Sequence, residues 1–232
     1  MRPEVRVSGQ LTEDAANLIA EAAERGGHIV LTGGSTPKSA YERVASLGAN
    51  WSHAEVWFSD ERCVEPEHEH SNFRMANDAL LSKIRARAVH RMQGELGPAK
   101  GAAEYESELR GVFGDIEVPR FDLILLGIGP DGHTASLFPG NPELGIRDKW
   151  VAGVEQPGMA PLVSRITLTL PVLNAGTSVA FLVSGEEKAD VVRRAFGSDT
   201  KTPEIPASLV EPRAEYVLLC DAAAAAGLRS LR

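Results

Sequence analysis

A histidine and an aspartate stand two residues apart in a glycine-rich loop near the middle of the chain. The loop reads GIGPDGH over residues 127–133 and directly follows the most apolar segment of the sequence. His133 is a candidate general base because an unperturbed imidazole titrates near neutral pH, and the Asp131 carboxylate can orient the ring. An isolated histidine is more often structural, so this prediction depends on what else converges on the loop.

The same loop formally contains the G-x-G-x-x-G pattern of dinucleotide-binding proteins. Three observations argue against that interpretation. Asp131 would place a carboxylate beside the pyrophosphate, Pro139-Gly140 interrupts the segment that would have to form the crossover helix, and the loop lies mid-chain rather than in an opening strand–helix–strand unit. We therefore expect no nicotinamide cofactor, and no other cofactor.

A second glycine turn, GGSTP at residues 33–37, combines backbone freedom with two hydroxyl groups. Gly33 and Gly34 let the chain turn sharply and approach a ligand, and the proline suits the first turn of a helix. The N–H groups of a helix N-terminus, together with the hydroxyls of Ser35 and Thr36, form a natural site for an anion such as phosphate. The alternative is an ordinary strand–helix turn capped by one of the hydroxyls.

Further charged and amide side chains begin or follow other apolar segments. Asp60 and Arg62 occupy alternate positions after a strand-like run, so on an extended chain they point the same way. Asn72 stands at a helix start, where its ordinary role is capping. Arg165 opens a strand-like run and Lys188 lies near the start of a helix. Both are suited to phosphate, although each taken alone is typical of a solvated side chain.

The other histidines and the serines predict neither a metal centre nor a serine nucleophile. The histidines lack the ligand spacing of a zinc site, and the closest pair lies in an acidic segment that is typical of surface. No G-x-S-x-G sequence is present. We therefore expect no metal; the remaining histidines are His28, His53, His68, His70 and His90.

The elements that must position these residues are apolar runs separated by helical patterns. The runs are nearly continuous in apolar residues, which is typical of parallel strands buried on both faces. Strands alternating with helices predict a three-layer α/β/α sandwich around a mostly parallel sheet. The predicted strands are 29–32, 56–59, 121–127, 179–184 and 216–220, with additional strands at 151–154 and 165–170, one or both antiparallel. The predicted helices are 11–25 capped by Thr12, 39–46, 73–87 capped by Asn72, 99–112, 186–196 and a short helix at 222–226.

Composition excludes several classes of protein. The net charge of −8 disfavours binding to nucleic acid or anionic membranes, so a phosphorylated substrate requires a local basic pocket. Cys63 and Cys220 are too few for a disulfide framework. The first ten residues lack the apolar core of a signal peptide, and no long apolar stretch follows. We expect a cytoplasmic, monomeric protein with one domain over residues 1–232.

Taken together, these motifs resemble the 6-phosphogluconolactonase family and, more broadly, the sugar-phosphate isomerase/deaminase fold, a modified Rossmann fold. The matching segments occur in family order over about residues 10–220: GGSTP (33–37), SDER (59–62), SN (71–72), GIGPDGHTASLFPG (127–140), RITLTLPVLNAG (165–176) and SGEEK (184–188). One departure is Glu65, which stands where the family usually has proline; Pro66 follows it.

The resemblance implies hydrolysis of 6-phosphoglucono-1,5-lactone in the oxidative pentose phosphate pathway. It implies His133 as the base, with Asp131 and Arg62 also catalytic. The phosphate clamp would use Arg165, Lys188 and the 33–36 turn, and Asp60, Asn72 and Gly132 would also contact the substrate. Two alternatives are a glucosamine-6-phosphate deaminase, which has a glutamate where this chain has Phe138, and a non-catalytic sugar-phosphate sensor.

Overall fold

A seven-stranded parallel sheet forms the centre of the protein, for which the computed structural model describes residues 2–229. The strands lie in the order β1-β10-β9-β6-β2-β3-β5. This confirms the predicted mostly parallel sheet. The strand bounds are β1 Glu4–Val7, β2 Gly27–Leu31, β3 Ala54–Phe58, β5 Ala88–Val89, β6 Leu123–Leu126, β9 Ser178–Val183 and β10 Glu215–Cys220.

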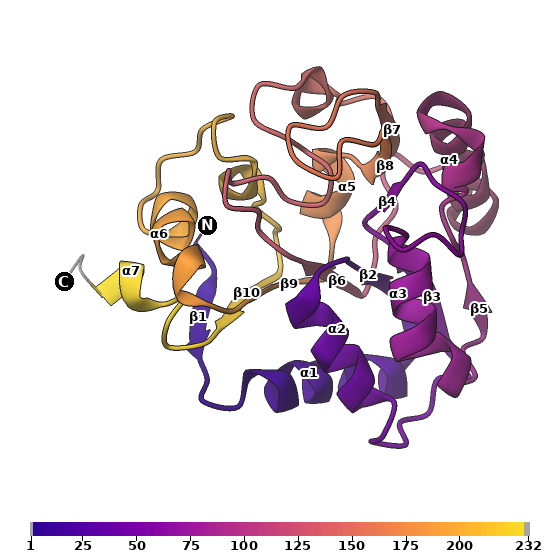
Figure 1. Ribbon diagram of the computed structural model, residues 1–232. Coiled ribbons are helices and arrows are strands. Elements are labelled where there is room, and N and C mark those ends of the chain that lie inside the picture. The colour runs from indigo at the N-terminus through magenta and orange to yellow at the C-terminus, as the bar shows by residue number, and fades with distance from the viewer. Residues whose placement is uncertain (1, 230–232) are drawn as a thin grey trace.

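Helices cover both faces of this sheet, as predicted (Figure 1). One face packs against α1 (Leu11–Arg25), α2 (Ser35–Val44) and α3 (Asn72–Ala79). The opposite face packs against α4 (Pro98–Phe113), α5 (Leu170–Ala175), α6 (Ala189–Phe196) and the short α7 (Ala226–Arg229).

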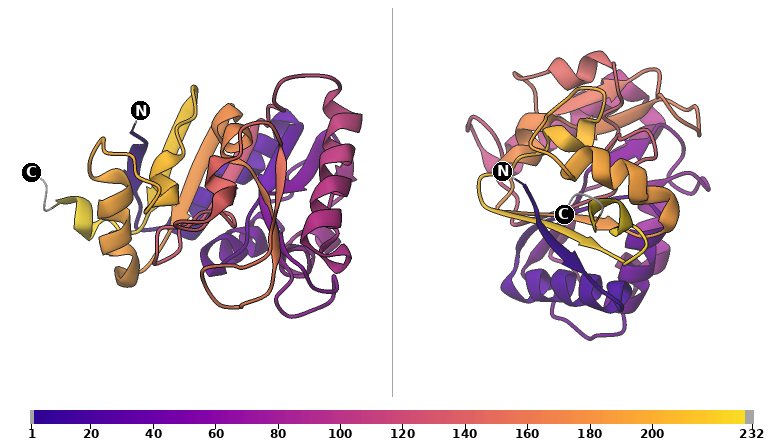
Figure 2. Two further views of the ribbon diagram at one scale, coloured as in Figure 1. Left: turned by 90° about the horizontal axis from the view of Figure 1, so that it is seen from above. Right: turned by 90° about the vertical axis from the view of Figure 1, so that its left-hand side faces the viewer.

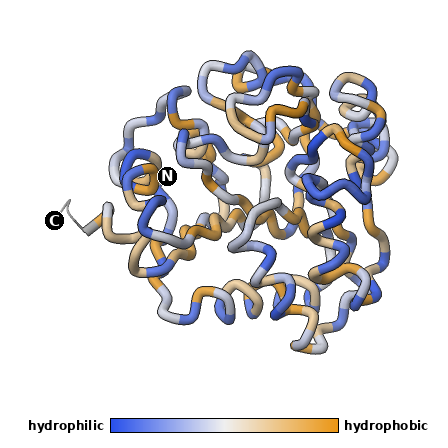
Figure 3. Tube along the Cα trace, in the orientation of Figure 1, coloured by the Kyte–Doolittle hydropathy of each residue, from blue (hydrophilic) through white to orange (hydrophobic). Residues whose placement is uncertain are grey.

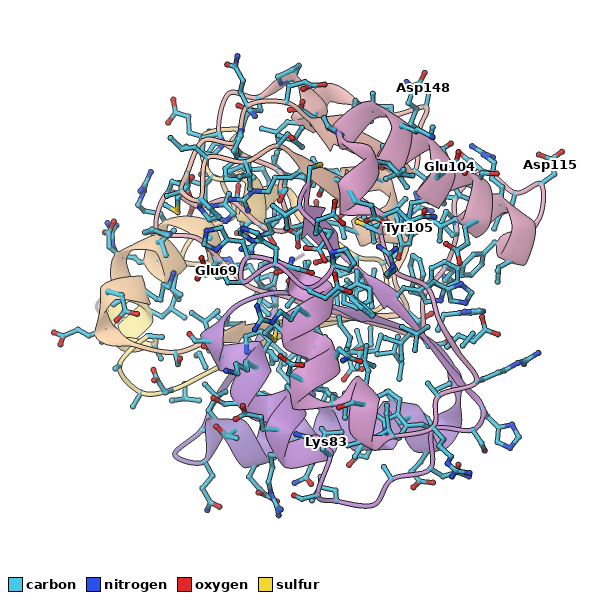
Figure 4. All side chains as sticks on the ribbon, turned by 45° about the vertical axis from the view of Figure 1, so that its right-hand side comes forward. Glu69, Lys83, Glu104, Tyr105, Asp115 and Asp148 are labelled. Atoms are coloured by element: carbon cyan, nitrogen blue, oxygen red, sulfur yellow. The ribbon has the colours of Figure 1, made fainter. Side chains whose placement is uncertain are left out.

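Alternate residues of each central strand enter the two cores, as the two-sided burial of a parallel strand requires. In β2, Val30 packs toward α4–α6, whereas Ile29 and Leu31 pack toward α1–α3. The apolar trace through the centre and the polar outer loops are visible in Figure 3. Figure 4 shows the same division on α4, where Tyr105 points into the protein and Glu104 points outward.

A small antiparallel sheet lies on the α4 side of the main sheet. It contains β4 (Asp60–Arg62), β8 (Arg165–Leu168) and β7 (Val151–Val154), in the order β4-β8-β7. The predicted strand at 151–154 is confirmed, and both extra strands are antiparallel to their neighbours. The strand predicted at 165–170 ends at Leu168, because Leu170 begins α5, a helix that was not predicted. Asp60–Arg62 forms a strand of this sheet, and its register places Arg62 directly opposite Arg165.

The direction of strand progression reverses between β2 and β6. From β2 the chain builds outward through β3, whereas from β6 it builds the opposite way through β9 and β10. Ligands of open α/β sheets bind beyond the carboxyl ends of the strands at such a reversal. The loops after β2 and β6 are the GGSTP turn and the GIGPDGH loop.

Five helix predictions need correction. The segment predicted as one helix over 186–196 is a 3₁₀ turn, Glu186–Lys188, followed by α6. Gln10 is the N-cap residue of α1, without a capping side-chain hydrogen bond, and Thr12 lies inside the first turn. Helix α2 begins at Ser35, before the predicted residue 39. Helix α3 is capped by the Ser71 hydroxyl rather than by Asn72, and it ends at Ala79 rather than at residue 87. The segment 222–225 forms turns, and the helix follows at 226–229.

Candidate active site

A cleft of about 360 Å³ lies over the carboxyl ends of β2, β3, β6 and β9. This volume is in the range typical of small-molecule sites. The structure brings ten of the twelve residues predicted for the site into the lining of this one cleft. They are Gly33, Gly34, Ser35, Thr36, Asp60, Arg62, Asn72, His133, Arg165 and Lys188.

The GGSTP turn presents the start of α2 to the cleft. Gly34 is the N-cap, with φ of 112°, a backbone conformation that strongly favours glycine. No side chain caps this helix end, so its first N–H groups are available to an anion. A side chain at Gly33 would collide with the Asn72 amide, so this position needs glycine as well. The Thr36 hydroxyl lies 2.7 Å from that of Ser184, which joins this turn to the loop after β9.

His133 and Asp131 form a hydrogen-bonded pair. The His133 Nδ1 atom lies 2.6 Å from Asp131 Oδ1, and the same oxygen accepts the His133 main-chain N–H at 3.1 Å. Burial by itself raises the pKa of Asp131, but the hydrogen bonds and charge of His133 outweigh that effect and hold the pKa below its usual value. The imidazole lines the cleft, whereas Asp131 lies behind it and outside the lining.

Gly132 does not line the cleft. Its N–H donates to the Gly129 carbonyl, its carbonyl accepts from Ala207 N, and a side chain at this position would contact Ile205. With φ of 93°, Gly132 shapes the turn that carries His133. The prediction that Gly132 contacts the substrate is therefore not supported by the cleft lining; this glycine is needed for its backbone conformation.

Arg62 and Arg165 stand side by side as cross-strand partners. Arg165 is 3% exposed, and its guanidinium donates to the carbonyls of Met159 and Pro161. Arg62 donates to the His70 carbonyl at 2.7 Å. Burial lowers the pKa of Arg165, although the group stays a cation near neutral pH.

Both guanidinium groups retain an unused donor. Neither Arg62 Nε nor Arg165 Nε has a hydrogen-bond partner within the described structure. Both atoms are buried, so the folded structure carries the cost of two unpaired donors.

Asp60 and Asn72 form the polar floor of the cleft beside this pair. Asp60 is 4% exposed, and its main-chain carbonyl accepts the Asn72 Nδ2–H at 2.9 Å. Glu61 points the other way, as the alternation of a strand requires. Its carboxylate accepts the main-chain N–H groups of Asn72 and Phe73 and thereby caps α3. Burial raises the pKa of Glu61 even though these hydrogen bonds act in the opposite direction.

Lys188 approaches from the loop after β9. This residue ends a 3₁₀ turn, Glu186–Lys188, that leads into α6, and its ammonium donates to the Ile128 carbonyl at 2.9 Å. Lys188 therefore joins the β9 loop to the His133 loop. Glu187 also lines the cleft, so together with Asp60 two carboxylates lie among the basic groups.

Several residues around the cleft were not predicted from the sequence. The buried Ser136 hydroxyl donates to Asp60, and the Phe138 ring packs against His133 with ring centroids 4.6 Å apart. Both belong to the 127–140 motif after β6, and membership of that motif was the only sequence feature that could have indicated them. Ser184 and Glu187 belong to the SGEEK segment, in which the sequence predicts only Lys188 as a site residue.

Within residues 2–229, no group of three or more His, Cys, Asp or Glu side chains is arranged to hold a metal ion. None of the helices in that range has the length and apolar character needed to cross a bilayer. Cys63 and Cys220 are both free thiols.

Comparison with known proteins places the chain in a family. The family model for glucosamine-6-phosphate isomerases/6-phosphogluconolactonase matches residues 4–219. The chain is 39% identical over 214 residues to the 6-phosphogluconolactonase of Synechocystis sp., covering 89% of this chain and 87% of the relative. It is 42% identical over 170 residues to the Homo sapiens 6-phosphogluconolactonase, covering 72% and 64%. The solved structure of 6-phosphogluconolactonase from Trypanosoma cruzi superposes with a TM-score of 0.84 at 30% identity, covering 98% of this chain and 97% of that one. The chain therefore belongs to the glucosamine-6-phosphate isomerase/6-phosphogluconolactonase family.

Proposed function

We propose that this protein hydrolyses 6-phosphoglucono-1,5-lactone to 6-phosphogluconate, a step of the oxidative pentose phosphate pathway. The observation that carries the proposal is the His133–Asp131 pair facing a cleft that also contains Arg62, Arg165 and an uncapped helix N-terminus. The 6-phosphogluconolactonase relatives support the same substrate.

The basic side of the cleft binds the phosphate. Arg165 and Lys188 supply two cations, and α2 adds main-chain N–H groups. This local positive field overcomes the net charge of −8. Binding energy from the phosphate holds the lactone ring against the catalytic groups.

His133 acts as the general base for water. Its Nδ1–H donates to Asp131, which leaves Nε2 as the nitrogen that accepts a proton. Water loses this proton as its oxygen bonds to C1 of the lactone, and the imidazolium is stabilised by the adjacent carboxylate. The C1–ring oxygen bond then breaks, and His133 returns the proton to the ring oxygen. General-base catalysis of this kind contributes about 10²–10⁴-fold.

The charge that develops on the lactone carbonyl oxygen needs a donor. Arg62 or a main-chain N–H of the 127–133 loop lies on the cleft wall and supplies it. One such donor contributes about 3–4 kcal/mol to transition-state stabilisation.

Two other functions are less well supported. Deamination of glucosamine 6-phosphate requires a further acid for ring opening, and Phe138 occupies the position where the deaminases carry a glutamate. Phe138 is fully buried against His133 and Arg165 and offers no proton. A non-catalytic sensor needs the basic groups but has no use for a paired imidazole on the cleft wall.

The test is lactone hydrolysis measured above the spontaneous rate in a rapid coupled assay. We expect wild-type protein to accelerate hydrolysis, and His133→Asn to lose at least about 10²-fold in kcat. His53→Asn is the matched control because His53 is exposed and does not line the cleft. Near-normal turnover by His133→Asn would remove the histidine from this role, and ammonia release from glucosamine 6-phosphate would favour the deaminase.

The proposal also includes a monomeric, single-domain enzyme that acts in the cytoplasm and binds no nucleic acid. Two free cysteines support a reducing compartment. Size-exclusion chromatography with light scattering tests the monomer, and a larger species at micromolar concentration would contradict it.

A further inference from the structure

The Asp60 carboxylate is held by hydrogen bonds from segments far apart in the chain. Its Oδ2 atom accepts the Ser136 hydroxyl at 2.7 Å, and its Oδ1 atom accepts the Ser59 hydroxyl at 2.9 Å. The Ser59 hydroxyl also lies 3.1 Å from Thr32 Oγ1, so its single proton is shared between two acceptors. The Ser136 hydroxyl points at Asp60 and is completely buried. Asn72 Nδ2 lies 3.4 Å from Oδ1 but only 2.9 Å from the Asp60 main-chain carbonyl. Ser136 therefore provides the shortest and most committed donor to this carboxylate.

Ser136 also secures the loop that carries His133, three residues earlier. Ala135 lies between them with φ of 48°, the one non-glycine residue in the described chain with a positive φ. A residue in this conformation is strained and keeps it only where its neighbours are firmly held. On one side the Thr134 hydroxyl donates to the Gly127 carbonyl, and on the other the Ser136 N–H donates to Thr167 Oγ1 at 3.2 Å.

The two partners of Ser136 belong to one small sheet. Asp60 on β4 and Thr167 on β8 are register partners. Ser136 thus attaches the end of the His133 loop to both strands, with its side chain on one and its main chain on the other. It does not line the cleft, so it acts on the substrate through other residues.

We propose that Ser136 is a positioning residue for the reaction: its hydroxyl holds the Asp60 carboxylate and the end of the His133 loop in a fixed relation. The kinetic part of this proposal rests on the lactonase function proposed above. The attachment of the loop by Ser136 is independent of that function. A hydrogen bond to a buried carboxylate is among the stronger ones in proteins, and small displacements of catalytic groups are costly in rate.

The first test compares Ser136→Ala with Ser178→Ala. Ser178 is a matched control because its hydroxyl is also buried, has no hydrogen-bond partner among the described residues, and does not line the cleft. We expect Ser136→Ala to lower kcat about 10–100-fold with KM changed less than about threefold, because the phosphate-binding groups are untouched. Ser178→Ala keeps wild-type kinetics. Ser136→Cys, with a weaker donor of similar size, falls between wild type and Ser136→Ala.

A double variant tests whether Ser136 acts through Asp60. If it does, adding Ser136→Ala to Asp60→Asn lowers kcat far less than Ser136→Ala does in the wild-type background. Full multiplication of the two effects would overturn the proposal. So would a Ser136→Ala enzyme with kcat within about twofold of wild type.

Hydrogen exchange gives a readout that is independent of activity. Main-chain amides of residues 127–140 exchange faster in Ser136→Ala than in wild type and are unchanged in Ser178→Ala. Unchanged exchange in Ser136→Ala overturns the positioning role whatever the kinetics show. A wild-type protein that does not hydrolyse the lactone, yet shows this exchange difference, refutes the proposed function and leaves the loop attachment standing.

Discussion

Replacing Asp131 by asparagine isolates the electrostatic part of the His133–Asp131 pair. The substitution keeps the shape of the side chain and removes its charge. In the proposed mechanism His133 becomes a cation in the transition state, 2.6 Å (Nδ1 to Oδ1) from this carboxylate. We therefore expect Asp131→Asn to lower kcat.

The magnitude follows from the distance and the exposure of the two groups. With charge centres about 4 Å apart and an effective dielectric constant near 20, the attraction is about 4 kcal/mol. The side chains are 17% and 27% exposed, so solvent screens part of it. Taking roughly half to three-quarters of that value, about 2–3 kcal/mol, predicts a loss of about 30–150-fold in kcat.

The assay is the same rapid coupled measurement of lactone opening, corrected for the spontaneous reaction. Glu108→Gln is the matched control because Glu108 pairs with His90 Nδ1 at an identical 2.6 Å, away from the cleft lining. It should leave kcat unchanged. A kcat for Asp131→Asn within about threefold of wild type would refute the stabilisation of an imidazolium by this carboxylate.

Three further predictions concern stability. Glu61→Gln should lower the free energy of unfolding, measured in urea, by about 2–3 kcal/mol. Both carboxylate oxygens of Glu61 accept main-chain N–H groups at the start of α3, whereas glutamine would turn its NH₂ group toward one of these donors. An unchanged free energy of unfolding would contradict this capping role. Tyr41→Phe should lower the free energy of unfolding by about 1–3 kcal/mol, because it leaves the buried main-chain N–H and carbonyl of Thr32 without the Tyr41 hydroxyl. The Tyr216 hydroxyl has no hydrogen-bond partner among the described residues, so Tyr216→Phe should leave the free energy of unfolding unchanged or raise it. Equal losses in the two variants would refute this distinction. Although burial acts in the opposite direction, the hydrogen bonds and charge of His133 hold the pKa of Asp131 below its unfolded value. The carboxylate therefore stabilises the fold fully above the unfolded pKa, and this contribution is lost as the pH falls through the folded pKa. The stability difference between wild type and Asp131→Asn should shrink in acid titrations, and a constant difference would contradict the shift.

The central strands and the loops after them were predictable because parallel strands buried on both faces leave a nearly continuous apolar pattern. Strand β6 reads LILL and is followed at once by the His133 loop. Once these strands are parallel, the loops at their carboxyl ends must lie at one edge, which brings His133 and the GGSTP turn together. Strand β1 was missed because its sequence, EVRV, is short, and all four residues are exposed at the sheet edge.

Other features depend on contacts between distant segments and leave no local pattern. Helix α3 ends at Ala79 although the periodicity continues, because Ser82 and Lys83 hydrogen-bond to carbonyls of the last turn. The charged residues of β4 are typical of a loop until β8 pairs with them. Glu61 is 3% exposed, which the sequence does not indicate, because its burial depends on the N-terminus of α3 lying beside it.

The pairing of β1 with β10 has a consequence for folding during synthesis. Figure 2 shows the N-terminal strand beside the late strand β10, and Glu4 is in register with Val217. At synthesis rates of about 5–20 residues per second, the first strand waits roughly 10–40 s for its partner to emerge. During that interval the charges of Glu4 and Arg6 disfavour pairing of this unpaired segment with strands of other nascent chains. A product released before residue 215 leaves this segment permanently unpaired, so incomplete copies of the enzyme are exposed to aggregation and proteolysis.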